Sequence, residues 1–192
     1  GSGHGVLELC VLLAEAGAVV APIPLWAVLC LGALPVAEFG SAEQQSRLLP
    51  GVGSGEVLLT AALTEAGLDD PASPATTAVH DGSGWLLTGT KICVPAAHLA
   101  HRILVPAQTG PGSVGVFLLD PAAAGVKHER QIATTGEPLT QLTLTAARVP
   151  EADVLGDPKK GAAIVAWMVE RATVGLCALE LGVAERALAM TA

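Results

Sequence analysis

Aromatic residues and positive charges are scarce in this chain of 192 residues. Aromatic side chains make up 3% of the residues and tyrosine is absent, although 51% of the residues are hydrophobic. The apolar content is therefore mostly Ala, Val and Leu, which suits packed helices and subunit interfaces. Ten Lys and Arg against 18 Asp and Glu give a net charge of −8. So little cationic surface argues against a nucleic-acid backbone as the partner.

Metal-ligand spacing is also absent. Cys10, Cys30, Cys93 and Cys177 lie far apart, each among apolar neighbours. We expect buried free thiols in a reducing cytoplasm and no metal site.

Charge is missing altogether from Ala16 to Ala37, which is long enough for a membrane span. Pro22, Pro24 and Pro35 interrupt it, and no flanking positive charge or basic leader accompanies it. We predict instead a helix from about Leu25 that is buried by protein. A membrane-anchored protein is the alternative that this stretch leaves open.

Two more helices are predicted before the pattern changes. The first runs over Val6–Ala16 and is broken by Gly17, and the second starts at Ser41, where Gln44 completes a capping box. The second helix is expected to end at Pro50-Gly51, with Gly53–Gly55 as the turn.

Short apolar runs separated by turn signals follow. Asp81–Gly84 and Gly110–Gly112 mark hairpins. This spacing predicts a barrel or sandwich of about a hundred residues. The predicted strands cover Val57–Leu63, Thr76–Val79, Trp85–Thr88, Ile103–Val105, Val114–Leu119, Val126–Gln131 and Leu139–Leu144.

The chain closes on a proline-free apolar stretch from Gly161, which predicts one long buried helix. From Gly161 to Leu179 its only ionisable side chains are Glu170 and Arg171. A buried carboxylate needs a partner or a task. Glu170 is therefore either one half of a structural ion pair or a proton acceptor in a dry pocket. The start without Met and the helical pattern at Ala192 lead us to expect a piece of a longer protein.

Several segments stand out by their order and spacing: Ser41–Glu56, Ala62–Glu65, Trp85–Lys91, Gly115–Asp120 with Gly125-Val126, Arg148–Pro150 with Leu155-Gly156, and Glu170–Ala172 with Leu181–Arg186. Together they resemble the acyl-CoA dehydrogenase family, in a divergent bacterial form.

The resemblance implies an α+β fold in three parts: a helical N-terminal segment (1–55), a central antiparallel β-barrel (56–156) and the start of a C-terminal four-helix bundle (157–192). It also implies FAD between barrel and bundle, and oxidation of an acyl-CoA thioester to its α,β-enoyl form. In some branches the base is a Glu directly before an Arg, and Glu170 matches it. In others the base lies on a later loop. Arg171 matches a position that borders the substrate, or else it serves as an interface arginine.

The resemblance also assigns the cofactor side. Thr64 matches a threonine that faces the flavin ring, and Ala62 and Leu63 contribute backbone. Cys93, Val94 and Pro95 replace an aromatic residue, Ile and Thr/Ser beside the flavin.

Two further positions depart from the family pattern on the substrate side: Asp70 stands near a usual serine, and Met168 replaces an acidic residue. We therefore hold two hypotheses. One is a flavin-dependent acyl-CoA dehydrogenase subunit of lipid or sterol side-chain catabolism, and the other is a non-catalytic structural subunit that has lost its FAD site. Expected partners are acyl-CoA, an electron-transfer flavoprotein or similar acceptor, and other subunits of a homo- or hetero-oligomer.

Overall fold

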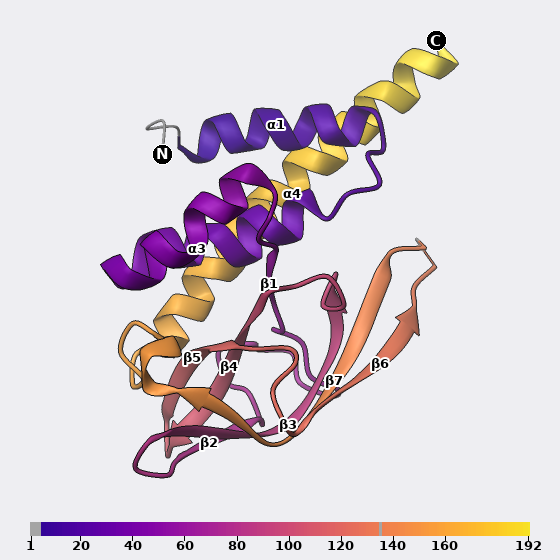
Figure 1. Cartoon of the computed structure of the whole chain (residues 1–192). Helices are drawn as coiled ribbons and strands as arrows, with labels where there is room; N and C mark the ends of the chain where they lie inside the picture. Colours follow the sequence, from indigo (N-terminus) through magenta and orange to yellow (C-terminus); the bar gives the residue numbers. More distant parts are fainter. Residues whose placement is uncertain (1–4, 135) are drawn as a thin grey trace.

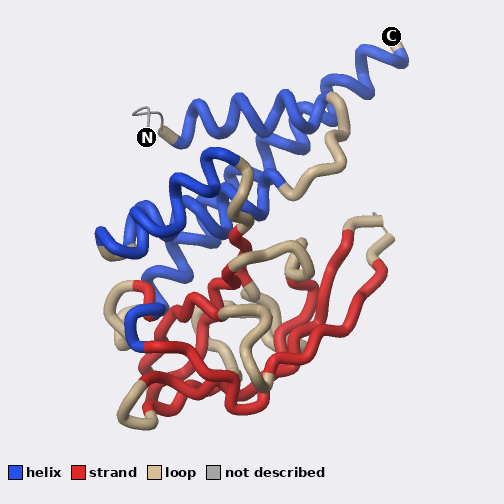
Figure 2. Tube along the Cα trace, in the orientation of Figure 1, coloured by secondary structure: helices blue, strands red, loops and turns tan. Residues whose placement is uncertain are grey.

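A computed structural model describes residues 5–134 and 136–192. Helices form one layer and strands the other (Figures 1 and 2). The helical layer contains α1 (Val6–Ala18), the π-helix η1 (Ala27–Ala33), α2 (Leu34–Phe39), α3 (Ala42–Ser54) and α4 (Gly161–Thr191). The predicted order of helices, then strands, then a helix is confirmed.

The strands form one mixed sheet in the order β6-β7-β3-β2-β4-β5-β8, with β1 beside β4. They are β1 (Leu59–Ala61), β2 (Thr77–His80), β3 (Gly84–Pro95), β4 (Arg102–Gly110), β5 (Ser113–Leu119), β6 (Val126–Ile132), β7 (Pro138–Pro150) and, after the 3-10 turn η2 (Glu151–Asp153), β8 (Val154–Leu155). Each predicted strand coincides with an observed one, and both predicted hairpins are present.

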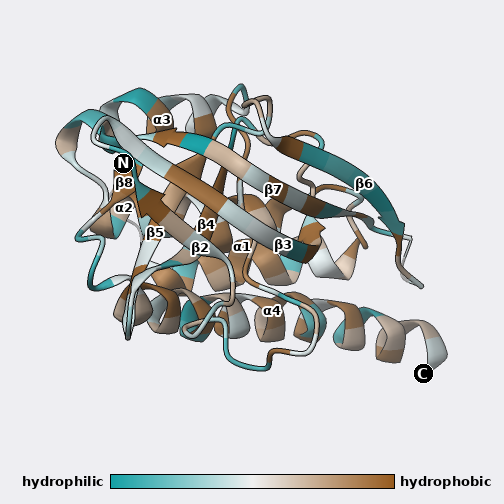
Figure 3. Cartoon of the chain, turned by 90° about the horizontal axis from the view of Figure 1, so that it is seen from below, coloured by the Kyte–Doolittle hydropathy of each residue, from teal (hydrophilic) through white to brown (hydrophobic). Residues whose placement is uncertain are grey.

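The sheet differs from the expected antiparallel barrel in two respects. It is open across the described residues, because β6 and β8 are edges. The edge strand β6 carries Lys127, Glu129 and Arg130 and is hydrophilic (Figure 3), which protects an edge from further pairing. In addition, β1 and β2 each pair with β4 in parallel.

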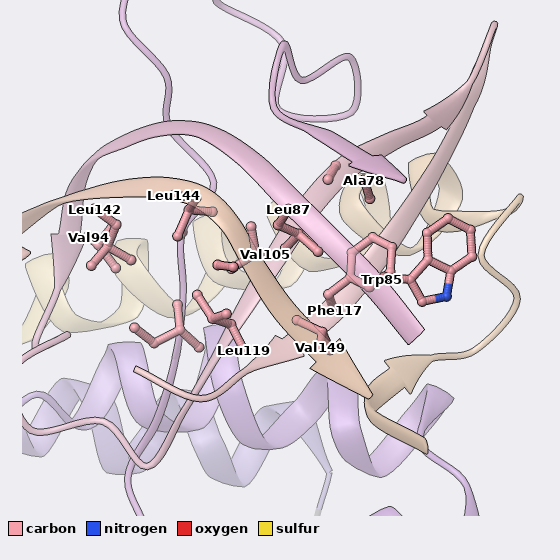
Figure 4. Packing of buried hydrophobic residues seen from close by; sticks show 14 of the residues in the cluster. Ala78, Trp85, Leu87, Val94, Val105, Phe117, Leu119, Leu142, Leu144 and Val149 are labelled. Carbon is pink, nitrogen blue, oxygen red and sulfur yellow. The ribbon is translucent and has the colours of Figure 1, made fainter. Parts of the chain in front are cut away.

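The central strands are buried on both faces, which explains their continuous apolar runs. In β5, Phe117 and Leu119 belong to a core inside the sheet, together with Trp85 and Leu87 of β3 (Figure 4). Their neighbour Leu118 belongs to a second core, between the sheet and the helices. Helices from both ends of the chain share this second core with the sheet. The core therefore does not divide the chain into separate units, and the domain boundaries at 56 and 157 stay a prediction.

The apolar stretch from Ala16 to Ala37 does not form one continuous helix. It contains the end of α1, a connecting loop, and a helix that begins at Leu25 as expected. The amide of Leu34 donates to the carbonyl of Leu29, five residues earlier, just before Pro35. This wider π-helical turn accommodates a proline ring, which would clash with the carbonyl four residues back in an α-helix.

The capping box at the start of α3 is confirmed. Ser41 Oγ accepts from the Gln44 amide at 3.1 Å, and Gln44 Oε1 accepts from the Ser41 amide at 3.0 Å. The predicted end at Pro50-Gly51 is wrong, because α3 continues through Pro50 to Ser54. It stops where Gly55 adopts a left-handed φ of 80°, a conformation that favours glycine.

The predicted long helix from Gly161 is confirmed, but the prediction that it is buried is wrong for much of its surface. Its buried residues lie along one side, which packs on α1, η1 and the sheet, and Trp26 Nε1 anchors it by donating to the Ala172 carbonyl at 2.7 Å. Large apolar side chains of α4 are exposed, including Val174, Leu181, Leu188 and Met190. By length and composition α4 could cross a membrane, a property that it shares with core helices of soluble proteins.

The cysteines also depart from expectation. All four are free thiols, but Cys93 and Cys177 are exposed, Cys10 is half-buried, and only Cys30 lies fully in the core. Apolar neighbours in sequence did not indicate burial, because some of those neighbours, such as Val11 and Leu176, are themselves exposed.

Candidate functional site

Two segments predicted to contact a flavin, residues 62–64 and 93–95, are brought together by the fold. The amide of Ile92 donates to the carbonyl of Thr64 at 2.9 Å. Thr60 Oγ1 donates to the carbonyl of Pro95 at 2.8 Å. The segment that ends β1 therefore lies against the end of β3, although about thirty residues separate them in sequence. We call the surface formed by Leu63, Thr64, Ile92, Cys93 and Pro95 the β1–β3 surface.

A β-bulge shapes this surface. Lys91 pairs with Leu142 of β7 and Val94 with Thr140, so Ile92 and Cys93 together face Gln141 alone. Cys93 adopts a left-handed φ of 53°, and its amide donates to Gln131 Oε1 of β6 at 2.7 Å. Gln131 was missed by the sequence reasoning, because nothing in its strand marks it and its partner is 38 residues away.

The predicted cofactor residues differ in what they can offer to a ligand. Ala62 and Val94 are buried in the core of the sheet, so they could contribute backbone only. Thr64 and Cys93 are exposed, and Leu63 and Pro95 are half-buried. Pro95 has no amide hydrogen, so a ligand here cannot receive a hydrogen bond from that position.

Directly below the surface lies a buried ion pair, which was also missed. Lys91 Nζ donates to Glu65 Oε1 at 2.6 Å, and their side chains are 0% and 7% exposed. Glu65 also accepts from the amide of Ala75 and from both the amide and the hydroxyl of Thr76. Both residues belong to segments that resemble the family, Ala62–Glu65 and Trp85–Lys91. A lysine in a strand pattern, however, gives no sign that its side chain is buried.

Charge and burial act in opposite directions on this pair. Burial raises the pKa of Glu65, but the hydrogen bonds from Lys91 and Thr76 and the charge of Lys91 outweigh it, so the pKa is lowered. Burial lowers the pKa of Lys91, and the hydrogen bond and charge of Glu65 offset this only in part.

Asp70 is an exposed residue of the loop 66–74 that follows Glu65. Its Oδ1 accepts from the amide of Ala72 at 2.9 Å, and its Oδ2 accepts from the hydroxyl of Ser73 at 3.0 Å. The carboxylate thus organises its own loop. A neighbouring carboxylate, Asp69, is also exposed.

The candidate base Glu170 is not in a dry pocket in this chain. Its side chain is 75% exposed, and Oε2 lies 3.2 Å from an Arg171 nitrogen. The two adjacent side chains therefore form an ion pair at the surface. Arg171 lies over the ring of Trp167, 4.0 Å from its centroid, and Trp167 packs edge-on against Phe39.

Met168 does not share this location. Its side chain is 0% exposed and belongs to the core between sheet and helices. It lies two residues before Glu170, which is about 200° around the helix. Within this chain it has no surface to offer to a substrate. The structure therefore groups 62–64 with 93–95, keeps Asp70 on the adjoining loop, and places Met168 away from Glu170.

The residues of the site suit the flavin ring of FAD but not its diphosphate. The exposed residue Thr64 and the bulge at Cys93 present a surface against which a flavin ring could lie. In contrast, Asp69 and Asp70 put two carboxylates on the loop near the family's usual serine, where they would repel a diphosphate.

Comparisons with known proteins place the chain in a family. Residues 1–56 match the model of the acyl-CoA dehydrogenase N-terminal domain, and residues 60–147 match that of the middle domain. Acyl-CoA dehydrogenase FadE28 of Mycobacterium tuberculosis is 40% identical over 157 residues, which is 82% of this chain and 43% of that protein.

Solved structures agree. A variant of the Tcur3481-Tcur3483 steroid ACAD is 46% identical, with a TM-score of 0.88, over 100% of this chain and 50% of that one. The ChsE4-ChsE5 complex from Mycobacterium tuberculosis is 33% identical, with a TM-score of 0.89, over the same shares. The chain thus spans about half the length of these relatives. On its matched domains and its fold, the chain belongs to the acyl-CoA dehydrogenase family.

Proposed function

We propose that this chain belongs to a flavin-dependent acyl-CoA dehydrogenase subunit that dehydrogenates an acyl-CoA thioester at its α,β bond, in lipid or sterol side-chain catabolism. The carrying observation is the hydrogen bond from the Ile92 amide to the Thr64 carbonyl, which joins the two predicted flavin-contacting segments into one surface. The similarity to a steroid ACAD supports the substrate class.

In this proposal Glu170 removes the proton α to the thioester carbonyl. FAD, when bound, supplies the acceptor for the hydride that leaves the β carbon. Arg171, held over Trp167, limits the freedom of the carboxylate through their ion pair. Because Glu170 is exposed in this chain, the proposal requires a covering surface, such as another subunit, to exclude water during proton transfer.

A second candidate is a non-catalytic structural subunit of a hetero-oligomeric acyl-CoA dehydrogenase that has lost its own FAD site. The specific observations in its favour are the carboxylates of Asp69 and Asp70 on the loop and the missing amide hydrogen at Pro95. The relative named as the ChsE4-ChsE5 complex is consistent with assembly from unlike chains.

The visible absorption spectrum of the full-length protein, purified alone and then with any co-purifying partner, separates these candidates. A stoichiometric flavin band in the lone protein supports the catalytic subunit. Flavin that is present only with the partner supports a shared site or the non-catalytic role. No flavin in either preparation would contradict the flavin-dependent function.

For a flavin-containing preparation, Glu170→Gln tests the base. We expect kcat to fall by about 10²–10⁴-fold with the flavin band unchanged. Glu180→Gln, at another exposed position of the same helix, is the matched control and should leave kcat unchanged. Equal activity in both variants would exclude Glu170 as the base.

We further propose an electron-transfer flavoprotein or similar acceptor as the redox partner, and a homo- or hetero-oligomer as the working assembly. The four free thiols are compatible with a reducing compartment, and we propose the cytoplasm.

A further inference from the structure

The buried carboxylate of the Glu65–Lys91 pair is held by a full set of hydrogen bonds. The carboxylate receives four donors: Lys91 Nζ at 2.6 Å, the Ala75 amide at 2.7 Å, the Thr76 amide at 3.1 Å and the Thr76 hydroxyl at 2.7 Å. Well-packed apolar residues of similar volume often stabilise a fold as well as a buried ion pair does. Bulk stability is therefore a weak reason for this arrangement, whereas fixed geometry is a strong one.

The position of the pair indicates what it fixes. Glu65 directly follows Thr64, and Lys91 directly precedes Ile92, and those two neighbours are themselves joined by a backbone hydrogen bond of 2.9 Å. The two segments are thus connected at consecutive positions, once through backbone and once through side chains. A shift of β1 along β3 would break both connections.

The same carboxylate closes the base of the loop 66–74. Glu65 stands before the loop, and Ala75 and Thr76 stand after it and donate to Glu65. Thr76 in turn lies tightly against β3, since a β-carbon at Gly89 would lie 2.5 Å from its hydroxyl. The Glu65 side chain therefore connects three parts of the candidate site: Thr64, the bulge at Ile92-Cys93, and the loop that carries Asp70.

We propose that Glu65 and Lys91 are positioning residues that hold the β1–β3 surface and the loop 66–74 in the arrangement that FAD binds. This inference rests on the proposed function. Both side chains are almost fully buried, so neither is placed to contact the ligand directly. Their effect comes through preorganisation, which lowers the cost of ordering the site on binding.

The test uses the full-length protein, with its partner if one is needed, stripped of flavin and titrated with FAD. Lys91→Met keeps an unbranched side chain that is one atom shorter and removes the ammonium group, so Glu65 loses its strongest donor. We expect the Kd for FAD to rise about tenfold or more because the surface is no longer preformed. Amide hydrogen exchange at Ala75, Thr76 and Ile92, measured without FAD, should also accelerate.

Two further variants separate positioning from general destabilisation. Gln44→Ala removes a buried polar side chain on α3, away from this surface, and should change the Kd by less than about threefold while lowering stability. The double variant Glu65→Gln with Lys91→Met removes both charges and keeps an acceptor for Ala75 and Thr76. It should bind FAD more tightly than Lys91→Met alone.

The outcomes are distinguishable. A folded Lys91→Met protein that binds FAD as the wild type does overturns the positioning role and leaves the proposed function intact. A wild-type protein that binds no FAD, alone or with its partner, overturns both. If Lys91→Met does not fold, Thr76→Val removes one donor from the carboxylate. An unchanged Kd together with unchanged exchange at Ala75 in that variant overturns the proposal.

Discussion

Gly17 of α1 lies directly against the backbone of Leu179 of α4, so closely that a β-carbon at Gly17 would overlap the Leu179 carbonyl oxygen. Three residues along α4, Gly182 lies in the same way against the carbonyl of Ala14. The first and last helices of the chain therefore cross at a pair of glycines, where their backbones meet without side chains between them.

We expect Gly17→Ala to destabilise the protein by about 2 kcal/mol or more, because the added methyl forces the two helices apart. Gly53→Ala is the control: Gly53 lies in α3 with open space around it, and alanine there should be neutral or stabilising by up to about 1 kcal/mol. Unfolding in denaturant measures both. Equal stabilities would mean that the crossing is looser than the structure has it.

The second prediction concerns Gln44, which does more than cap α3. Its Nε2 donates to the carbonyls of Ala152 and Val154, each at 2.8 Å, so it ties the helix to the chain around β8. Gln44→Ala should cost about 2–4 kcal/mol, because it removes its part of the cap and the donor to the buried Val154 carbonyl and the part-buried Ala152 carbonyl.

The neighbouring Gln45 gives a matched comparison. It also donates to two carbonyls, those of Ala37 and Gly40, but one of these bonds is exposed, so water can replace it. We expect Gln45→Ala to cost about 1 kcal/mol, measured in the same unfolding assay. A loss as large as that of Gln44→Ala would show that burial is not what separates the two residues.

The third prediction concerns the thiols. Burial raises the pKa of the Cys30 thiol to about 11, from an ordinary 9.0, and the nearby Cys10 adds to the effect. At neutral pH this leaves about a hundredfold less thiolate than an ordinary thiol has, and access is blocked as well.

Alkylation of the native protein, followed by mass spectrometry, should therefore modify Cys93 and Cys177 first and Cys30 last. Unfolding the protein should remove the difference. Modification of Cys30 at the rate of Cys177 in the folded protein would contradict the burial described here.

The fourth prediction is a loss of stability in acid. The pKa of the Glu65 carboxyl in the folded protein lies below its ordinary value of 4.5, which it regains on unfolding. The unfolded state then binds more protons, so the contribution of Glu65 is present above pH 4.5 and is lost as the pH falls below it.

Glu65→Gln should therefore be less stable than the wild type at pH 7, by roughly 3 kcal/mol, because Lys91 is left buried without a counter-charge. The difference should shrink below pH 4.5. A difference that is constant from pH 7 to pH 3 would argue against the ionised pair.

Local patterns determined much of the fold. The short apolar runs and turn residues placed every strand from Thr77 to Pro150 and both predicted hairpins, because strand pairing across a tight turn is decided by neighbours in sequence. Ser41 and Gln44 marked the start of α3, because a cap is formed within one helical turn. Residues 62–64 and 93–95 could be nominated together only through the family resemblance.

Tertiary structure alone decided the rest. Sequence could not show that Lys91 is buried against Glu65, that Gln131 reaches Cys93, or that Glu170 is exposed while Met168 is enclosed. Each of these depends on segments that are distant in the chain and come together on folding. An apolar run such as α4 specifies that a helix will pack, but its neighbours decide which side is buried, and therefore which residues remain available to a ligand.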